Sequence, residues 1–573
     1  MQLTKNKIYG VQQPGRLVHR YATSSQKYTE QTEYLLRYST LNLLRSYDPI
    51  TRRYLTDIQL PFQPETLAVS RTSCFAQCGH EAIIITEEGY QHQFEIPKAS
   101  AYEAFLSEDG NVLVVCAGDD DRIIVTSYLN EGDGFVISKQ YTLDAEDNIL
   151  GNSSESSVII FNQNHLFLFS PEPDVKSMFS VKDLFGGGIE LNDVCADHDI
   201  SHLYAISTEN TIYKVALDTL SVVPETLVTL ADDCFTIRVI DGLVFALSGH
   251  KLYSISVEDN QLVNAISDDN LRPFEIIDAC HDVAYIHNDH DSYSIFEFGS
   301  DQVQVLDCIP NDYIDIRSTG DSYLVNFGDS IRKYDHDFKV YETMPVSSKC
   351  ECIHSFGEDF VVCSNKSTLY ITRISENKTF EIELPQNVYN IAFCPADNIL
   401  LVANKSVCAV YNLEGQLVKK IEGFSTLPKI SDSIITTYKD NILRLITYPT
   451  FDEVLFEFPD RILANYDHKD YSYLVTESND RVSFNVFNKI TMKCEFRANS
   501  NLEYLEDSDV VMSRFGNHFA FGFSGSQEVA YYVNGFLEHI EFDFDLTGLV
   551  WKNDEELLVL SNNAGVEYKF TYD

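Results

Sequence analysis

The sequence predicts an all-β protein built from repeated units. Short apolar runs alternate with turns rich in Asp, Asn and Gly along all 573 residues. The 33 tyrosines and 36 phenylalanines, against one tryptophan and five methionines, are typical of strands. Runs with the 3.6-residue period of a helix are almost absent, and the best two candidates are residues 99–106 and 175–185. A chain of this length also exceeds what one hydrophobic core can organise, so we expect two or more domains.

The strand signals recur with a period of about forty residues. Each unit holds a short apolar run, a polar turn, a second apolar run, another turn and an alternating strand. We expect fourteen such units, which begin near residues 16, 66, 102, 148, 190, 234, 274, 312, 349, 389, 428, 463, 505 and 546.

Residues 391–421 show the pattern of one unit most clearly. Residues 391–394 predict a strand, residues 395–398 a turn, and residues 399–403 a strand that is apolar throughout. The turn contains Asp and Asn, which tolerate the backbone conformations of tight turns. A strand that is apolar on both faces is typical of one packed between two neighbouring layers. Residues 104–115 and 549–560 repeat the same order.

These strand–turn–strand units resemble the blades of the β-propeller superfamily, and the resemblance covers nearly the whole chain. They are similar to WD40-like repeats, but the Trp-Asp dipeptide and a recurrent Gly-His are missing, so the Asp–His–Ser/Thr–Trp tetrad of that family cannot be assigned. The resemblance implies two tandem β-propellers of about seven four-stranded blades each, in residues 1–309 and 310–573.

The ends of the chain are expected to meet. The last unit, residues 546–573, supplies three strands at most, and residues 3–11 read as a strand that could complete it and close the ring. A tandem array of β-sandwiches is the alternative fold, because it also gives evenly spaced strands.

The charge of the chain limits its partners. The formal net charge is −45, from 42 basic and 87 acidic residues. Such a surface disfavours direct binding to nucleic acid and to anionic membranes, because both need Lys and Arg. The acidic residues serve solubility, or they attract a partner that carries a basic patch.

The sequence predicts a cytoplasmic protein. No apolar run is long enough to span a membrane, and the first residues lack the apolar core of a signal peptide. The 13 cysteines are scattered mostly singly through apolar strands, which favours reduced, buried thiols over a disulfide framework.

Two kinds of sequence element could hold metal. Asp-His-Asp elements recur, but each falls where a hairpin turn belongs, and we predict turns. Cys and His also cluster twice, yet alternate residues of a strand are about 6.6 Å apart, too far for one zinc ion, and we predict buried thiols. The elements are residues 197–199, 289–291, 335–337 and 467–470, and the clusters are Cys74, Cys78 and His80, and Cys350, Cys352 and His354.

Three further motifs partly resemble a phosphate loop, a nucleophile elbow and a calcium site. The glycines at 186–188 follow a short helical candidate, whereas a phosphate loop precedes its helix. Residues 522–526 lack the spacing of a nucleophile elbow. Residues 119–121, three aspartates, predict a solvated turn, with a Ca²⁺ site as the alternative. We therefore predict no catalytic, metal or cofactor-binding residue, and no cofactor.

The sequence favours a non-catalytic scaffold for protein interactions. Propellers present loops on a rigid frame, and two of them would offer a broad docking surface for one or more protein partners within a larger assembly. The alternative is an enzyme or small-ligand receptor with its site at the mouth of a propeller channel.

Overall fold

The computed structural model describes most of the chain between residues 2 and 571. The gaps in the description are residues 11–12, 20–33, 49–52, 71, 87–90, 108, 120–121, 132–133, 145–149, 154–155, 163, 172–177, 187–188, 198–200, 218–223, 241, 250, 268–272, 280–282, 289–292, 298–301, 306–313, 319–321, 329, 336–339, 345, 347–351, 358, 366–367, 384–389, 395–396, 404–406, 423–428, 432, 480, 507 and 562–563.

The described residues form an all-β structure of fourteen four-stranded antiparallel sheets. The chain divides into two compact units. The N-terminal unit is residues 10–309, and the C-terminal unit is residues 310–573 together with residues 1–9. Seven of the described sheets lie in each unit.

Each sheet of the N-terminal unit consists of four strands that follow one another in the sequence. Their first strands are β2 (Gln13–His19), β6 (Thr66–Val69), β10 (Ala101–Leu106), β14 (Leu150–Ser153), β18 (Leu191–Ala196), β22 (Cys234–Ile240) and β26 (Pro273–Ala279), and the last sheet ends with β29 (Gln302–Val305).

The C-terminal unit repeats this plan. Its first strands are β30 (Asp315–Ser318), β34 (Cys352–Gly357), β38 (Asn390–Cys394), β42 (Lys429–Ser431), β46 (Arg461–His468), β50 (Val510–Phe515) and β54 (Gly548–Trp551). All fourteen predicted unit starts fall within five residues of one of these first strands, so the repeat is confirmed as a series of four-stranded sheets.

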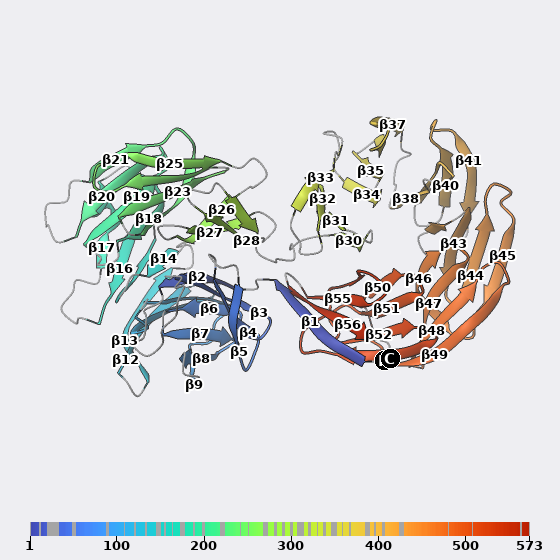
Figure 1. Cartoon of the computed structure of the whole chain (residues 1–573), viewed down its shortest axis with the longest axis horizontal. Coiled ribbons are helices and arrows are strands. Elements are labelled where there is room, and N and C mark those ends of the chain that lie inside the picture. Colours follow the sequence, from blue (N-terminus) through green and yellow to red (C-terminus); the bar gives the residue numbers. More distant parts are fainter. Residues whose placement is uncertain are drawn as a thin grey trace. The chain divides into compact units, whose positions relative to one another are not determined.

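The first strands of successive sheets contact one another. In the N-terminal unit the contacts run from β2 through β6, β10, β14, β18 and β22 to β26, and β26 also contacts β2. In the C-terminal unit they run from β34 through β38, β42, β46 and β50 to β54, and β54 contacts β30. Within each unit the sheets follow one another in chain order (Figure 1).

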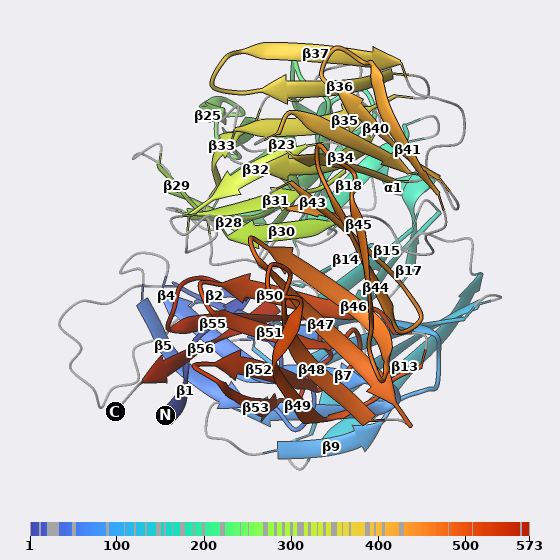
Figure 2. The ribbon, with the colours of Figure 1, turned by 90° about the vertical axis from the view of Figure 1, so that its right-hand side faces the viewer.

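The two ends of the chain meet in one sheet. β1 (Gln2–Gly10) pairs with β56 (Ala564–Thr571), which is followed by β55 (Glu556–Ser561) and β54. Figures 1 and 2 both show β1 at the edge of this sheet. The hydroxyl of Thr4 also donates to the carbonyl of Lys569 at 3.4 Å. The predicted pairing of the N-terminal strand with the last unit is therefore present.

The hydrophobic core lies between successive sheets. One cluster joins β11 (Val112–Gly118) and β12 (Arg122–Asn130) to β15 (Val158–Phe161) and β16 (His165–Phe169) of the next sheet. The second strands are buried on both faces, as the apolar run β39 (Ile399–Ala403) shows. Outer strands are mostly exposed, so burial decreases toward the fourth strand of a sheet.

The predicted turns form where Asn, Asp and Gly allow them. Asn398 has a φ of +56° between β38 and β39, and Gly110 has a φ of +75° between β10 and β11. A Cβ at Gly110 would stand 2.8 Å from the Ser73 hydroxyl, so the position needs glycine for space as well as for conformation.

One helical candidate is wrong. Residues 101–106 form strand β10, whose register against β11 pairs Ala101 with Gly118. The pairing with a buried neighbour overrides the weak helical period. The other candidate contains α1 (Val181–Phe185), a helix of five residues. Among the described residues no helix is long and apolar enough to cross a membrane.

Candidate functional site

A surface groove of about 300 Å³ lies in the C-terminal unit, on the sheet that begins with β42. Its walls come from β43 (Ile434–Lys439), β44 (Ile442–Thr447) and β45 (Glu453–Glu457), with the end of β41 (Leu417–Glu422) opposite. The inner end of the same sheet face, at Ile435 and Ile446, is buried against the preceding sheet. The groove therefore continues the core between two sheets outward, to a part of the sheet face that the neighbouring sheet does not cover.

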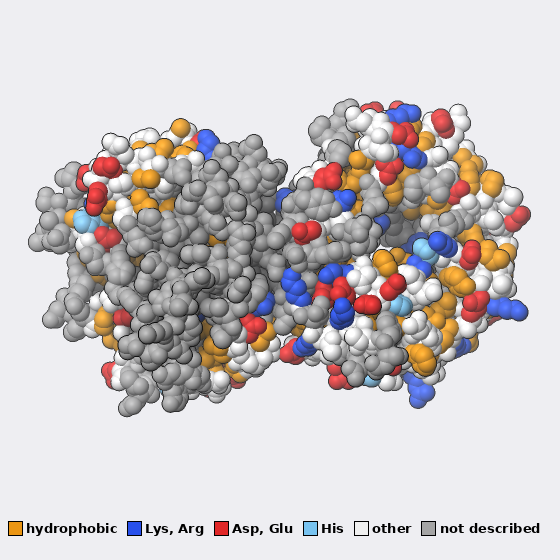
Figure 3. Space-filling view, in the orientation of Figure 1, with side chains coloured by type: hydrophobic (Ala, Val, Ile, Leu, Met, Phe, Trp, Pro, Cys, Tyr) orange, Lys and Arg blue, Asp and Glu red, His pale blue; other side chains and the backbone are white. Residues whose placement is uncertain are grey.

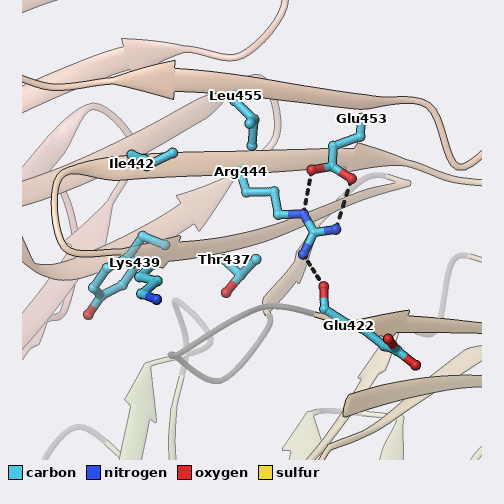
Figure 4. Close-up of a pocket in the computed structure, with 8 residues that line it drawn as sticks. Glu422, Thr437, Lys439, Ile442, Arg444, Glu453 and Leu455 are labelled. Carbon is cyan, nitrogen blue, oxygen red and sulfur yellow. Dashed lines mark hydrogen bonds and ion pairs between the residues drawn. The ribbon is translucent and has the colours of Figure 1, made fainter. Parts of the chain in front are cut away.

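Arg444 organises the groove (Figure 4). Its Nε lies 2.8 Å from Oε1 of Glu453, and its Nη2 donates to Oε2 at 2.8 Å. Its Nη1 donates to the backbone carbonyl of Glu422 on the facing strand. A two-pronged pair of this kind fixes the guanidinium in one orientation. The apolar side chains of Ile442 and Leu455 stand beside it and are exposed, Leu455 at 60%.

Several outer strands expose two consecutive apolar residues. Neighbouring residues of a strand point to opposite faces, so such a pair leaves both faces of the strand uncovered. In β45 the pair is flanked by Glu453 and Glu457, both exposed. The exposed pairs are Val136 and Ile137, Leu262 and Val263, Leu417 and Val418, and Val454 and Leu455.

Two first strands of the C-terminal unit each carry a cation that is bonded to the backbone of another first strand. Lys429, the first residue of β42, donates its ammonium group to the carbonyl of Asn465 in β46. Arg317 of β30 donates Nη1 to the carbonyl of Phe356 at 3.0 Å, and its guanidinium lies 4.5 Å from the centre of that ring.

The pKa of Lys429 is lowered, first because the protein desolvates its ammonium group. The charge of Asp467 opposes this shift, and the charge of Arg317 adds to it. Lys429 remains accessible to solvent.

Asp467 has closer partners of its own. Its Oδ2 accepts from Nδ2 of Asn465 at 2.6 Å, and its Oδ1 accepts from the hydroxyl of Ser472. Nζ of Lys489 lies 3.6 Å from the same Oδ1, and the side chain of Lys489 is fully buried. This carboxylate therefore connects two hairpins of one sheet.

A different network connects two first strands of the N-terminal unit. Oδ2 of Asp193 in β18 accepts from the Thr236 hydroxyl, the Ile237 amide and Nη1 of Arg238, each at 2.9 Å, and all three donors belong to β22. Oδ1 accepts from the amide of Val194 at 2.8 Å. Asp193 is 7% exposed, so this is a buried and well-bonded ion pair.

The described parts of the Asp-His-Asp elements belong to separate strands or strand ends. Asp197 follows β18 and Asp467 lies in β46, in different units, and Asp335 directly follows β32 (Ile331–Tyr334). Residues 198–200, 289–292 and 336–339 lie outside the described residues. Among the residues that the structure describes, no group of three or more His, Cys, Asp and Glu side chains is placed to hold a metal ion.

Asp197 does take part in a serine–histidine–aspartate contact, but the geometry is not that of a catalytic triad. Its Oδ2 lies 2.9 Å from Nδ1 of His202, and the hydroxyl of Ser201 lies 2.7 Å from the same nitrogen. A triad needs the aspartate on one ring nitrogen and the serine on the other. The contacts therefore join the end of β18 to the start of β19 (His202–Ser207), and the turn predicted at residues 197–199 falls largely outside the described residues.

The cysteines of the two predicted clusters differ in how deeply they are buried. Cys74 is buried in β7 (Ser73–Cys78), and burial raises the pKa of its thiol to about 12. Cys78 is partly exposed beside Glu65. In the second cluster Cys352 is exposed, and Cys350 lies outside the described residues.

His354 is hydrogen-bonded instead to the hydroxyl of Ser364 at 2.7 Å. Nine of the described cysteines, Cys74, Cys78 and Cys352 among them, are free thiols, whereas Cys363 is disulfide-bonded. The expectation of reduced cysteines thus fails at Cys363.

The glycine and aspartate motifs are local structure where they are described. Gly186 ends α1 with a φ of +93°, and its amide donates to the carbonyl of Lys182. Asp119 accepts from the amide of Ser100 at 2.9 Å, and its own amide donates to the carbonyl of Arg122 at 2.9 Å. Residues 120–121 and 187–188 lie outside the described residues.

No protein-family model and no curated protein matches this sequence. The site residues must therefore be judged from their geometry. Sequence reasoning missed Arg444, Lys429 and Asp193, because single charged residues in strands carry no motif. One signal was available: Arg444 interrupts the otherwise apolar run of residues 442–446.

Proposed function

We propose that the chain is a non-catalytic scaffold that docks protein partners, and that each unit is a seven-bladed β-propeller. Three observations support the ring: the four-stranded sheets, the contacts between successive first strands, and the cores between successive sheets. The C-terminal ring would be closed by β1, in the manner common to propellers. Such a frame is rigid, and its edges and loops are free to carry binding residues.

The groove beside Arg444 is the observation that carries the docking proposal. It combines exposed apolar side chains with an arginine, and protein interfaces have apolar cores and are enriched in arginine. Its outer wall, β45, is the edge of its sheet, so an extended segment of a partner can add to it as a further strand.

The charge of β45 selects the partner. Glu453 is already paired with Arg444, whereas Glu457, two residues beyond the exposed Val454 and Leu455, is exposed. The matching segment therefore has apolar residues beside a basic one. The net charge of −45 would attract such a partner before contact. We propose that the partner belongs to a larger cytoplasmic assembly.

A capture experiment with matched variants tests this proposal. The full chain is used as bait in an extract of its source cell, alongside Leu455→Lys and Phe536→Lys. Phe536 is 68% exposed at the start of another outer strand, β53 (Phe536–Glu541), so its variant controls for added charge. We expect a stoichiometric partner on the wild type and on Phe536→Lys, lost from Leu455→Lys and weakened at about 0.5 M salt, where charges are screened within a few ångströms.

Two results would contradict the proposal. Equal capture by Leu455→Lys would exclude the groove as the docking site. Absence of any stoichiometric partner from all three baits would exclude the scaffold function.

A further inference from the structure

The outer strand β45 pairs with β44 along one of its two edges. Among the described strands it is the last of its sheet, and its register sets Leu455 opposite Arg444 and Glu453 opposite Ile446. Figure 3 shows hydrophobic side chains at the surface along the outer edge of the C-terminal unit, where Figure 1 places β41 and β45. An edge strand can pair with a strand from another chain, and its outward backbone groups decide how that strand binds.

Two backbone hydrogen bonds show which groups of β45 point outward. The amide of Phe458 donates to the carbonyl of Asn441 at 2.8 Å, and the amide of Thr447 donates to the carbonyl of Asp452 at 3.0 Å. The register between these two bonds is continuous. Hydrogen-bonded and non-hydrogen-bonded pairs alternate along an antiparallel ladder. Residues 454 and 456 therefore bond to β44, whereas residues 453, 455 and 457 direct their N–H and C=O groups to the open edge.

The same three residues direct their side chains to the groove. Alternate residues of a strand share one face, and Glu453 and Leu455 both line the groove with Arg444. Glu457 follows on that face, opposite Ile442, which also lines the groove. Opposed residues of an antiparallel pair also share a face. A residue that bonds to this edge therefore places its own side chain in the groove.

The chemical character changes along this row of side chains. Glu453 is paired with Arg444 through both of its oxygens, so it needs no further cation. Glu457 is exposed and accepts a 3.4 Å hydrogen bond from a side-chain amide, a neutral donor that does not balance its charge. Leu455 lies between them and is 60% exposed, and Val454 on the other face is 44% exposed. This edge suits one basic and two apolar residues.

We propose that the groove binds an extended partner segment antiparallel to β45, in the order basic, any residue, apolar, apolar. This inference rests on the docking proposal and specifies the segment that docks. The first apolar residue lies opposite Leu455 and exchanges two backbone hydrogen bonds with it. The basic residue, two positions earlier, lies opposite Glu457, because antiparallel strands run in opposite directions. The second apolar residue lies opposite Val454 on the other face of the sheet.

Fluorescence anisotropy with a labelled peptide and the full chain tests this geometry. The peptide has the core Lys-Thr-Leu-Val between Gly-Ser ends, and two further versions carry one N-methyl group, on the Leu or on the Val. The Leu N–H would bond to the carbonyl of Leu455, whereas the Val N–H points away from β45. At low ionic strength we expect saturable binding of the unmethylated peptide. Methylation of the Leu should weaken it at least about tenfold, and methylation of the Val less than about twofold.

Variants of the chain place the peptide on this edge. Leu455→Lys should abolish binding, whereas Phe536→Lys, the exposed control on β53, should bind the peptide as the wild type does. Glu457→Gln should weaken the Lys peptide about threefold, in the range of an exposed ion pair, and leave a peptide with Gln in place of the Lys unchanged.

Four outcomes would overturn the proposed geometry: no saturable binding, equal binding of the two N-methylated peptides, full binding by Leu455→Lys, or an equal effect of Glu457→Gln on the Lys and Gln peptides. A second copy of the chain is the other possible occupant, and a dimer in analytical ultracentrifugation that Leu455→Lys abolishes would identify it instead.

Failure of this inference is distinct from failure of the docking proposal. If the bait captures a partner through Leu455 but the two N-methylated peptides bind alike, the docking proposal stands and strand addition fails. If the peptides differ as expected but no bait captures a partner, the edge binds such segments and the scaffold function fails.

Discussion

The two units differ in the charged side chains found at contacts between their own first strands. In the N-terminal unit, Asp193 receives four hydrogen bonds and faces one cation, so the β18–β22 contact is electrically balanced. In the C-terminal unit, Lys429 donates to the carbonyl of Asn465 across the β42–β46 contact. A contact between first strands thus contains a buried ion pair in one unit and, in the other, a lysine bonded to a backbone carbonyl.

The two contacts therefore differ in what is left behind when one side chain is removed. A buried charge with all its partners stabilises the contact between two sheets only as long as every partner remains. Lys429 is exposed and bonded to a backbone carbonyl, so its removal leaves no buried charge behind.

Removal of Asp193 should have the largest effect. Asp193→Ala removes the carboxylate that pairs with Arg238, whose side chain is 16% exposed, and that accepts from the Thr236 hydroxyl. Arg238 keeps its hydrogen bond to the Ile237 carbonyl, which carries no compensating charge. We expect the free energy of unfolding to fall by about 3 kcal/mol, the low end for breaking a buried ion pair. Urea denaturation followed by circular dichroism measures the loss, and hydrogen exchange locates it in β18 and β22.

Asp259→Ala is the matched control, because Asp259 is an exposed aspartate of the same unit. It should change the free energy of unfolding by less than about 0.5 kcal/mol. A similar loss in both variants would show that the Asp193 network does not hold the two sheets together.

Deletion of residues 1–9 should have the next largest effect, and in the other unit. It exposes the edge of β56 and removes the backbone hydrogen bonds of one strand pair. At about 1 kcal/mol for each net hydrogen bond, partly offset by the freed chain entropy, we expect a loss of about 2 kcal/mol.

The fluorescence of Trp551 reports this loss. Trp551 is the single tryptophan, lies in β54 of the same sheet and is fully buried. Thr4→Ala, which removes only the contact with the Lys569 carbonyl, should cost less than about 0.5 kcal/mol. An unchanged urea midpoint after the deletion would mean that β1 does not stabilise this unit.

The sequence predicts the fold of this molecule better than it predicts the candidate site. The repeat and the pairing of the chain ends follow from periodicity, because apolar second strands such as β39 must be buried on both faces. The helical prediction at residues 101–106 is wrong because a run of six residues fits both a weak helical period and a strand. The contacts of Asp193 with Thr236, Ile237 and Arg238, which lie 43 to 45 positions away, depend on how the sheets are arranged, which no local pattern carries.

Acidification should destabilise the C-terminal unit through His518. Desolvation lowers the pKa of His518 below its usual 6.5, although the nearby charge of Asp554 opposes the shift. The folded state therefore binds its proton less readily than the unfolded chain does, and stability present above pH 6.5 is lost as the pH falls below it.

The measurement compares wild type with His518→Gln at pH 7.5 and pH 5.5. We expect the wild type to lose more stability than the variant in Trp551-monitored urea unfolding, by at most about 1.4 kcal/mol, the limit for one proton over the pH unit between 6.5 and 5.5. The ring of His518 lies 5.3 Å from that of Trp551, so the probe is local to the group that titrates. Equal losses in the two proteins would assign the acid sensitivity to other groups.

Removal of Lys429 should have the smallest effect on stability, and of the opposite sign to that of Asp193. Its lowered pKa means that the folded state disfavours the charged ammonium, so Lys429→Gln removes an unfavourable charge and keeps a donor for the Asn465 carbonyl. We expect a change between zero and a gain of about 0.5 kcal/mol in urea unfolding. A loss of 2 kcal/mol or more, judged against about 3 kcal/mol for a broken buried pair, would make Lys429 a structural residue like Asp193 and remove the contrast between the two contacts.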